Sequence, residues 1–202
     1  LDKKLFLELN GSYHNPWLDQ LMMFLSSTGA WIPLYIFLLY LIIRHFKKDS
    51  WMVLLAVALT IALADQITSS LMKPFFERLR PTHDPEIESL VHVVNHYRGG
   101  KYGFASSHAA NTFGVATLMW LIFKNYRPWI GLLFLWALAV GFTRIYLGVH
   151  FPGDILAGDL AVPLVVQAYG VLGRPDLQDL VLVVDVAGVI GASQGVLLWF
   201  GA

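Results

Sequence analysis

Six long apolar stretches occupy most of this chain of 202 residues. A helix that spans a membrane needs about 20 consecutive, mainly apolar residues, and each stretch has roughly that length. The stretches run approximately over residues 21–43, 51–72, 103–123, 128–147, 155–172 and 180–200. Charged residues make up 14% of the chain, whereas a soluble domain carries about 25%. The sequence therefore predicts an all-α, polytopic membrane helical bundle with about six transmembrane helices.

Residues 1–20 differ from the apolar stretches. Leu5, Phe6 and Leu9 recur at helical spacing, and Asn10 then interrupts the pattern. The pattern predicts a short N-terminal helix lying in the membrane interface, and a frayed terminus is the alternative. The segment lacks the continuous apolar core and the small-residue cleavage site of a signal peptide.

The composition excludes several classes of protein. Lys plus Arg and Asp plus Glu each number 14, so no overall charge points to a nucleic-acid partner. The chain has no cysteine, which excludes a disulfide framework, a thiolate nucleophile and a cysteine-bound metal. We find no internal repeat or low-complexity linker, so we expect one integral-membrane domain over residues 1–202.

Two short turns between the apolar stretches are rich in basic residues. They contain Arg44, Lys47 and Lys48, and Lys124 and Arg127. Because basic residues concentrate in cytoplasmic loops, both turns are expected on the cytoplasmic side. The opposite helix ends, and the long segment 74–102, then face outward.

Three clusters of polar residues fall at those outward-facing ends. They contain Lys73, Arg80 and Pro81; Ser106, Ser107 and His108; and Arg144, His150 and Asp154. The clusters played no part in assigning the apolar stretches, so their convergence on one face supports both the topology and a shared site.

The cations of these clusters suit a phosphate group. Phosphate carries charge over several oxygens, and Lys73, Arg80 and Arg144 would stabilise that charge. Arginine offers a planar fork of donors and lysine a mobile point charge. The third apolar stretch begins near Ser106 and Ser107, where free helix N-terminal amides favour an anion.

The two histidines suit covalent phosphoryl transfer. Asp154 follows His150 by four residues, and an aspartate on one ring nitrogen leaves the other free to attack phosphorus. His108 would then protonate the leaving alkoxide as a general acid.

Together these motifs resemble a known family. Lys73, six intervening residues and Arg80-Pro81 form the first motif, and Ala105-Ser106-Ser107-His108 the second. Thr143-Arg144, five residues, His150, three residues and Asp154 form the third. The ordered set resembles the signature of the type 2 phosphatidic acid phosphatase superfamily, which includes bacterial acid phosphatases and vanadium haloperoxidases. The resemblance covers about residues 5–158 and leaves 159–202 as an atypical tail.

The resemblance implies specific roles for these residues. It implies a metal-independent phosphatase without a cofactor, with a phosphohistidine intermediate on His150, Asp154 as its orienting partner and His108 as acid. The implied phosphate ligands are Lys73, Arg80, Ser106, Arg144 and the amide of Ser107. This chain has Ala-Ser-Ser-His and Thr-Arg where the family commonly has Pro-Ser-Gly-His and Ser-Arg, which affects substrate fit more than chemistry.

The resemblance also implies a lipid phosphate as substrate and membrane lipids as partners. In a bacterial inner membrane the site would face the periplasmic or outer side. The candidate substrates are undecaprenyl diphosphate, phosphatidylglycerol phosphate, phosphatidate and lipid A phosphates. We favour undecaprenyl diphosphate, because Arg78, Arg98 and Lys101 could hold a second phosphate.

Other functions remain open at this point. A lipid phosphotransferase would use the same His150 but pass the phosphoryl group to an acceptor alcohol. A lipid transporter or flippase would explain polar residues such as Asp65 within the apolar stretches. His83, His92 and His96 could recruit zinc, although a solvated loop also explains them.

Overall fold

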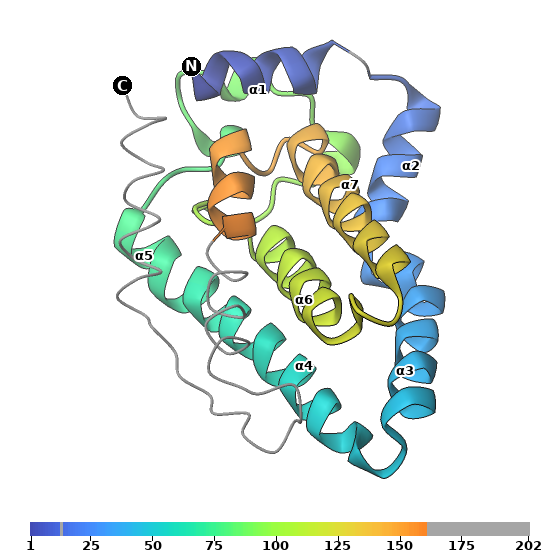
Figure 1. The fold of residues 1–202 in the computed structure, drawn as a ribbon. Coiled ribbons are helices and arrows are strands. Elements are labelled where there is room, and N and C mark those ends of the chain that lie inside the picture. The colour runs from blue at the N-terminus through green and yellow to red at the C-terminus, as the bar shows by residue number, and fades with distance from the viewer. Residues whose placement is uncertain (13, 161–202) are drawn as a thin grey trace.

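The computed structural model describes residues 1–12 and 14–160, and its regular structure there is helical apart from one isolated bridge between Leu79 and Tyr102 (Figure 1). The α-helices are α1 (Asp2–Gly11), α2 (Pro16–Ser26), α3 (Ile32–Phe46), α4 (Ser50–Asp65), α5 (Lys73–Phe76), α6 (Ser107–Phe123) and α7 (Leu132–Tyr146). The short 3₁₀ helices are η1 (Thr28–Trp31), η2 (Lys47–Asp49), η4 (Pro81–His83), η5 (Glu88–Leu90), η6 (Val94–His96) and η7 (Pro128–Gly131), and η3 (Gln66–Met72) is a π-helix. Residues 152–160 form a further helix. The all-α prediction is confirmed for this part of the chain.

Two of the predicted apolar stretches begin or break differently in the structure. The stretch 21–43 is divided at Ser27, whose backbone is extended, so that α2 ends and η1 and α3 begin a separate helix. The stretch 103–123 becomes helical only at Ser107. Apolarity alone does not reveal such boundaries, since Ser27, Thr28 and Gly29 are exposed at the first one whereas residues 103–106 are buried at the second.

The number of transmembrane helices stays a prediction. Within the described residues, Thr28–Phe76 and Pro128–Tyr146 are long and apolar enough to cross a membrane. The first of these contains the turn at η2, so it includes both α3 and α4. The predicted stretch 180–200, and residues 161–172 of the fifth stretch, lie outside the described residues.

Helix α6 lies at the centre of the bundle, between α4 and α7 (Figure 1). Its buried residues occur on all sides, as expected for a helix enclosed by others. Ala109, Ala110, Gly114 and Ala116 are among them, and such small side chains allow neighbouring helix backbones to approach closely. The start of α6 is therefore fixed relative to the ends of its neighbours.

Helix α1 packs across one end of the bundle, against α7 (Figure 1). Phe6 is fully buried and meets the ring of Phe151 edge-on at 5.3 Å. The side-chain Nδ2 of Asn10 donates to the carbonyl oxygens of Ile145 and Tyr146, at 3.3 and 2.8 Å. The predicted short helix is confirmed, and α1 is a packed element rather than a frayed terminus.

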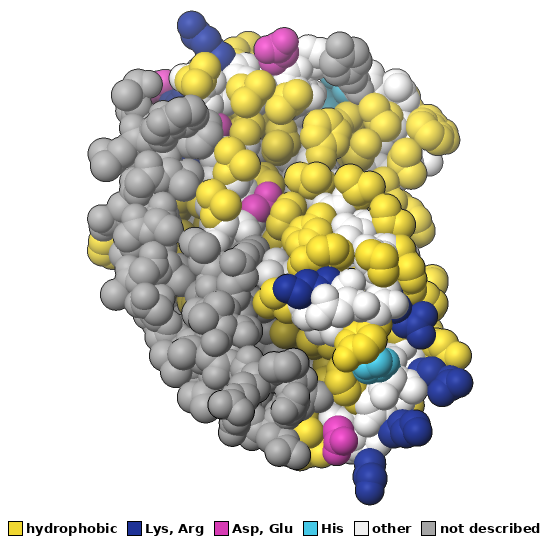
Figure 2. Space-filling model, in the orientation of Figure 1, with side chains coloured by type: hydrophobic (Ala, Val, Ile, Leu, Met, Phe, Trp, Pro, Cys, Tyr) yellow, Lys and Arg dark blue, Asp and Glu magenta, His cyan; other side chains and the backbone are white. Residues whose placement is uncertain are grey.

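The outer surface of the helices is strongly apolar. Large exposed hydrophobic side chains recur along three helices: Ile36, Tyr40 and Ile43 on α3, Leu55 and Ile61 on α4, and Leu135, Leu138 and Phe142 on α7. Figure 2 shows hydrophobic side chains over much of the face that is not covered by grey atoms, with Lys and Arg side chains gathered toward the end where α3 turns into α4. An exposed apolar surface of this kind suits contact with lipid.

Candidate active site

The three sequence clusters come together at the end of the bundle covered by α1. Lys73 follows η3, Ser107 and His108 begin α6, and Arg144 lies in the last turn of α7. His150 lies in the loop after α7, and Asp154 in the helix of residues 152–160. Arg80, Asp154 and His150 all lie beside Gly103. The backbone N–H of His150 donates to the carbonyl oxygen of Arg144 at 3.3 Å, and Lys73 donates to Ser107 at the start of α6, so the three clusters meet in one site.

Lys73 directly follows the π-helix η3, and its side chain contacts the start of α6. The ammonium of Lys73 donates to the hydroxyls of Ser107 and Ser69, at 2.8 and 3.0 Å. Thr68 also donates to the Ser107 hydroxyl, at 2.8 Å. Pro74 has no backbone N–H to continue a regular helix, and π-helical segments often occur at functional sites. The Ser107 side chain thus holds Lys73 in position, a role that the sequence analysis did not foresee.

Ser106 is fully buried and stabilises the start of α6. Its hydroxyl accepts from the backbone N–H of Ala109 at 3.5 Å, as an N-cap does, and its own N–H donates to the carbonyl oxygen of Asp154 at 3.0 Å. These contacts connect the start of α6 to the helix that carries Asp154. A phosphate contact by Ser106 stays a prediction.

His150 lies beside Asp154, which pairs with Arg78, which in turn pairs with Asp2. Its Nδ1 lies 3.4 Å from Oδ2 of Asp154, and the two side chains are 2% and 0% exposed. The other oxygen of Asp154 accepts from Arg78 at 2.7 Å, and Arg78 also pairs with Asp2 of α1. Asp2 accepts in addition from the backbone N–H of Gly153, at 3.0 Å. Helix α1 therefore helps to hold Asp154 beside His150.

Glycine at position 103 lets the loop before α6 pass directly over this pair. A β-carbon there would lie 3.0 Å from Oδ2 of Asp154 and 3.5 Å from Nδ1 of His150. Nearby, Arg80 donates from its Nε to the carbonyl oxygen of Tyr102 at 3.0 Å. The loop therefore brings Arg80 close to His150 and Asp154.

Arg144 is 3% exposed and held by side chains from two other segments. It donates to the hydroxyl of Tyr97 at 2.9 Å and to the hydroxyl of Ser26 at the end of α2. Its Nε is buried and has no hydrogen-bond partner among the described residues. Such a donor suits an anionic ligand, because a buried cation without a full set of partners is costly.

The site favours the neutral form of His150, which lies in a loop between two helices. Burial, followed by the charges of Arg80 and Arg144, holds the pKa of His150 well below its usual range. A neutral imidazole has a free lone pair with which to attack phosphorus. For Arg78, burial acts against the charge, but Asp154 and Asp2 outweigh it and raise the pKa of the guanidinium.

A zinc site at His83, His92 and His96 is not formed. In the part of the chain that the structure describes, no group of three His, Asp or Glu side chains is arranged to hold a metal ion. His92 instead lies 2.8 Å from Asp19 and stacks on His14, with ring centroids 4.3 Å apart. These contacts tie α2 to the long loop.

An apolar cavity of about 520 Å³ extends from the site between α3, α4, α6 and α7. His108 and Ser26 line it beside the polar site. The remaining lining is mostly aliphatic and aromatic, and includes Leu39, Ile42, Leu54, Val57, Ile61, Val115, Trp136 and Val140. A polar site joined to an apolar cavity can hold both parts of an amphipathic molecule.

The sequence did not reveal the residues outside the three motifs that hold the motif side chains in place. Asp2, Ser26 and Tyr97 lie far from the three clusters in the sequence, so spacing carried no signal for them. Arg78 was considered only as a ligand for a second phosphate. The structure instead commits Arg78 to Asp154 and Asp2.

The helical fold, the apolar surface and the cationic histidine site define a membrane phosphatase. The sequence profile of the PAP2 superfamily matches residues 51–168. The chain belongs to this superfamily, and the resemblance found in its motifs is confirmed.

Similar proteins include bacterial lipid phosphatases. The chain is 41% identical over 162 residues to a lipid A 4'-phosphatase of Bacteroides thetaiotaomicron, covering 78% of this chain and 70% of the relative. A lipid A 4'-phosphatase of Porphyromonas gingivalis is 39% identical over 82% of this chain and 70% of its own length. The crystal structure of Aquifex aeolicus LpxE matches with a TM-score of 0.59 and 28% identity, over 84% of this chain and 94% of that one.

Proposed function

We propose that this chain hydrolyses the phosphate monoester of a membrane lipid through a phosphohistidine on His150, and that the lipid is lipid A carrying a 4'-phosphate. The observation that carries the proposal is the arrangement of His150, buried beside Asp154 and surrounded by the charges of Lys73, Arg80 and Arg144. This arrangement supplies a nucleophile and positive charge for the phosphate oxygens at the same place.

In the first step, Nε2 of His150 attacks phosphorus. Nδ1 faces Asp154, so the proton on Nδ1 can be stabilised by the carboxylate while Nε2 keeps its lone pair. A nitrogen–phosphorus bond forms as the bond between phosphorus and the lipid oxygen breaks. His108 gives its proton to that oxygen, so the lipid leaves as an alcohol.

In the second step, water hydrolyses the phosphohistidine. His108 takes a proton from the water, whose oxygen attacks phosphorus as the nitrogen–phosphorus bond breaks. His108 regains the proton it gave, and inorganic phosphate is released. Lys73, Arg80 and Arg144 would stabilise the charge on the phosphate oxygens in both steps.

The cavity beside His108 supports a lipid substrate. Its apolar lining could hold acyl chains while the phosphate reaches the cations. The relatives that are 41% and 39% identical are both named lipid A 4'-phosphatases, which favours that lipid. The earlier preference for undecaprenyl diphosphate rested on a second phosphate site, and Arg78 is committed to two carboxylates instead.

The basic turns at residues 44–48 and 124–127 support an orientation in the bacterial inner membrane with the site on the periplasmic side. In that orientation the phosphate would be removed from a lipid in the outer leaflet of this membrane. This placement belongs to the proposal.

The test is phosphate release by the purified full chain in detergent with chelator present. The panel contains lipid A 4'-phosphate, phosphatidylglycerol phosphate, phosphatidate and undecaprenyl diphosphate. We expect lipid A to be the best substrate. His150→Ala should lower the rate by at least about 10³-fold, because the nucleophile is lost. Asp154→Asn should lower kcat by roughly 10²- to 10⁴-fold.

The matched control is His96→Ala, which removes an exposed histidine of the long loop and should keep the wild-type rate. Trapping of ³²P on the wild-type chain but not on His150→Ala would support the covalent step. Full activity of His150→Ala would overturn the mechanism. Phosphate release that requires an added acceptor alcohol would favour the phosphotransferase alternative.

A further inference from the structure

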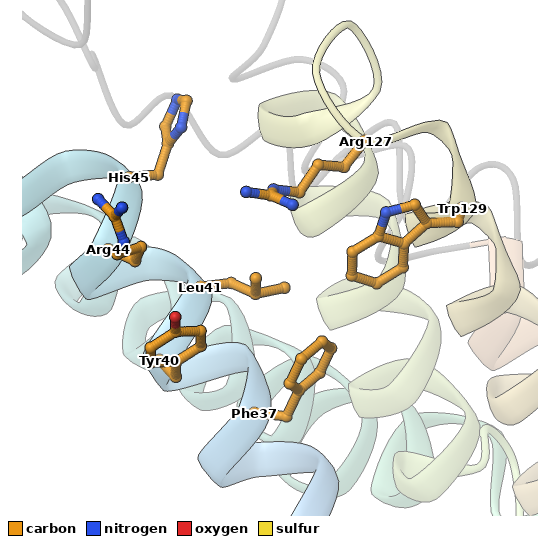
Figure 3. Close-up of a pocket in the computed structure, with 7 residues that line it drawn as sticks. All are labelled: Phe37, Tyr40, Leu41, Arg44, His45, Arg127 and Trp129. Carbon is orange, nitrogen blue, oxygen red and sulfur yellow. The ribbon is translucent and has the colours of Figure 1, made fainter.

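A second cavity lies at the end of the bundle away from His150. It has a volume of about 540 Å³ and is lined by Phe37, Tyr40, Leu41, Arg44, His45, Arg127 and Trp129 (Figure 3). Arg44 and His45 belong to the last turn of α3, and Arg127 lies in the turn between α6 and α7. The mechanism uses none of these residues, so the cavity needs its own explanation.

The charged side chains of this cavity come from two separate turns. Arg127 reaches from its turn toward α3, across Leu41, while Arg44 and His45 stand on the α3 side (Figure 3). Neither arginine makes an ion pair with any acid in the described ranges 1–12 and 14–160. Two guanidinium groups on one cavity therefore remain available to an anion, and their planar forks match phosphate oxygens.

Aromatic contacts connect the two turns. Phe37 of α3 meets Trp129 of η7 with ring centroids 5.8 Å apart. On the other side, the ring of His45 lies 4.8 Å from that of Tyr126 and 5.4 Å from that of Phe123. Phe37, Trp129 and His45 line the cavity and are held by these contacts without a ligand, so little ordering of them would be needed on binding.

The rim of the cavity is aromatic and partly exposed. Leu41 forms a buried floor, whereas Phe37, Tyr40 and Trp129 are 42%, 58% and 42% exposed. Exposed aromatic side chains at the end of a membrane helix are typical of the lipid headgroup region. A free anion from water needs only the arginines, but an exposed apolar rim continuous with α3 suits a ligand with acyl chains.

We propose that this cavity binds the phosphodiester headgroup of an anionic glycerophospholipid, with its phosphate between Arg44 and Arg127 and its acyl chains along Phe37 and Tyr40. The ligand would lie in the leaflet opposite the one that presents the substrate. The site is separate from His150, since α6 alone spans roughly 25 Å between the two ends. Its occupation does not depend on the proposed phosphatase mechanism.

The test measures lipid binding to the delipidated full chain by native mass spectrometry. The probes are dioleoyl phosphatidylglycerol and dioleoyl phosphatidylcholine, which as phosphodiesters are not substrates for monoester hydrolysis. The cavity variant is Arg44→Gln with Arg127→Gln. Its matched control is Lys48→Gln with Lys124→Gln, which removes the same charge from the same two turns but no residue that lines the cavity. Phosphate release in detergent verifies that each variant is folded.

We expect the cavity variant to bind phosphatidylglycerol on the order of tenfold more weakly, since two charge-assisted contacts are lost. The control should change by less than about twofold, and phosphatidylcholine should bind less well than phosphatidylglycerol to the wild type. Equal weakening by both double variants would overturn the proposal, because diffuse positive charge would then explain binding. If the double variant does not fold, the exposed single change Arg44→Gln should give a smaller decrease of the same kind.

Inorganic phosphate tests whether the cavity binds a free anion from water instead of a lipid headgroup. If phosphate alone raises the thermal stability of the wild type as much as phosphatidylglycerol does, and the cavity variant loses both effects, the ligand is a free anion and the lipid proposal is wrong. A gain that needs the lipid, and is lost in the cavity variant, supports the proposal.

Discussion

The surroundings of His150 favour the neutral form of its ring. Burial disfavours the protonated ring, and each nearby cation adds to that effect. The ring is therefore neutral from alkaline pH down to values well below the usual histidine pKa. In the proposed mechanism protonation would remove the attacking lone pair of His150, so the cations proposed to bind phosphate would also keep this histidine reactive.

Replacement of Arg80 should weaken this effect on His150. In Arg80→Gln one neighbouring positive charge is lost, so protonated His150 is less disfavoured and its pKa should rise. The measurement is ¹⁵N-histidine NMR of the free enzyme in micelles between pH 8 and pH 5, with the His150 signal identified by its loss in His150→Ala. Wild-type His150 should stay neutral through most of this range. Lys101→Gln, which removes an exposed cation of the same loop, should leave it unchanged. A wild-type midpoint near 6.5 would contradict the prediction.

The sequence predicted those contacts of the site that join residues close together in the chain. His150 and Asp154 are four residues apart, and the structure places them in contact. The supporting pair of Arg78 and Asp2 was not predictable, because 76 residues separate them and Arg78 resembled the other loop cations. A contact between distant segments is set by packing, which a pattern along one sequence does not contain.

Among the helices, the crossing of residues 152–160 over the start of α6 controls the geometry of the site. A β-carbon on Gly158 would lie 2.6 Å from the carbonyl oxygen of Ser106 and 3.2 Å from the β-carbon of Ala109. The first of these is a backbone atom and cannot rotate away. Glycine at this position therefore lets Asp154 and the α6 N-terminus approach each other.

Gly158→Ala should accordingly destabilise the protein and disturb catalysis. The added methyl group must push the two helices apart, which we expect to cost about 1–3 kcal/mol. Because Ser107 and His108 begin α6, the rate of phosphate release should fall as well. Thermal unfolding and activity in detergent provide the two measurements. Gly29→Ala is the matched control, since a β-carbon there would have no neighbour within 4 Å. Equal unfolding temperatures for the two variants would refute this role of Gly158.

Helix positions were predicted better than helix ends. The apolar stretches 51–72 and 128–147 correspond to α4 with η3 and to η7 with α7. The break at Ser27 was not predicted, because the short polar run of residues 26–29 lies within a longer apolar stretch that is typical of one helix. At this break Ser26, the last residue of α2, accepts a hydrogen bond from Arg144.

Across the whole molecule, the two ends of the bundle differ in chemistry. One end carries the histidine site under α1, and the other carries the basic turns and the second cavity. A hydrophobic surface lies between them (Figure 2). The length of α6, roughly 25 Å, is close to the thickness of about 30 Å of a bilayer core. This difference predicts that the end with the basic turns faces the cytoplasm and the end with the histidine site faces the periplasm.

Single cysteines can test that orientation directly, because the chain contains no cysteine of its own. Lys101→Cys places a thiol in the loop beside the site, and Lys48→Cys and Lys124→Cys place one in each basic turn. We expect a membrane-impermeant maleimide to label position 101 in intact spheroplasts, since positively charged turns are retained in the cytoplasm. Positions 48 and 124 should react only after the membrane is permeabilised, with labelling of detergent-solubilised protein as the control for thiol reactivity. Labelling of position 48 or 124 from outside would place the histidine site in the cytoplasm. The enzyme would then act on the inner leaflet and the second cavity would face the outer one.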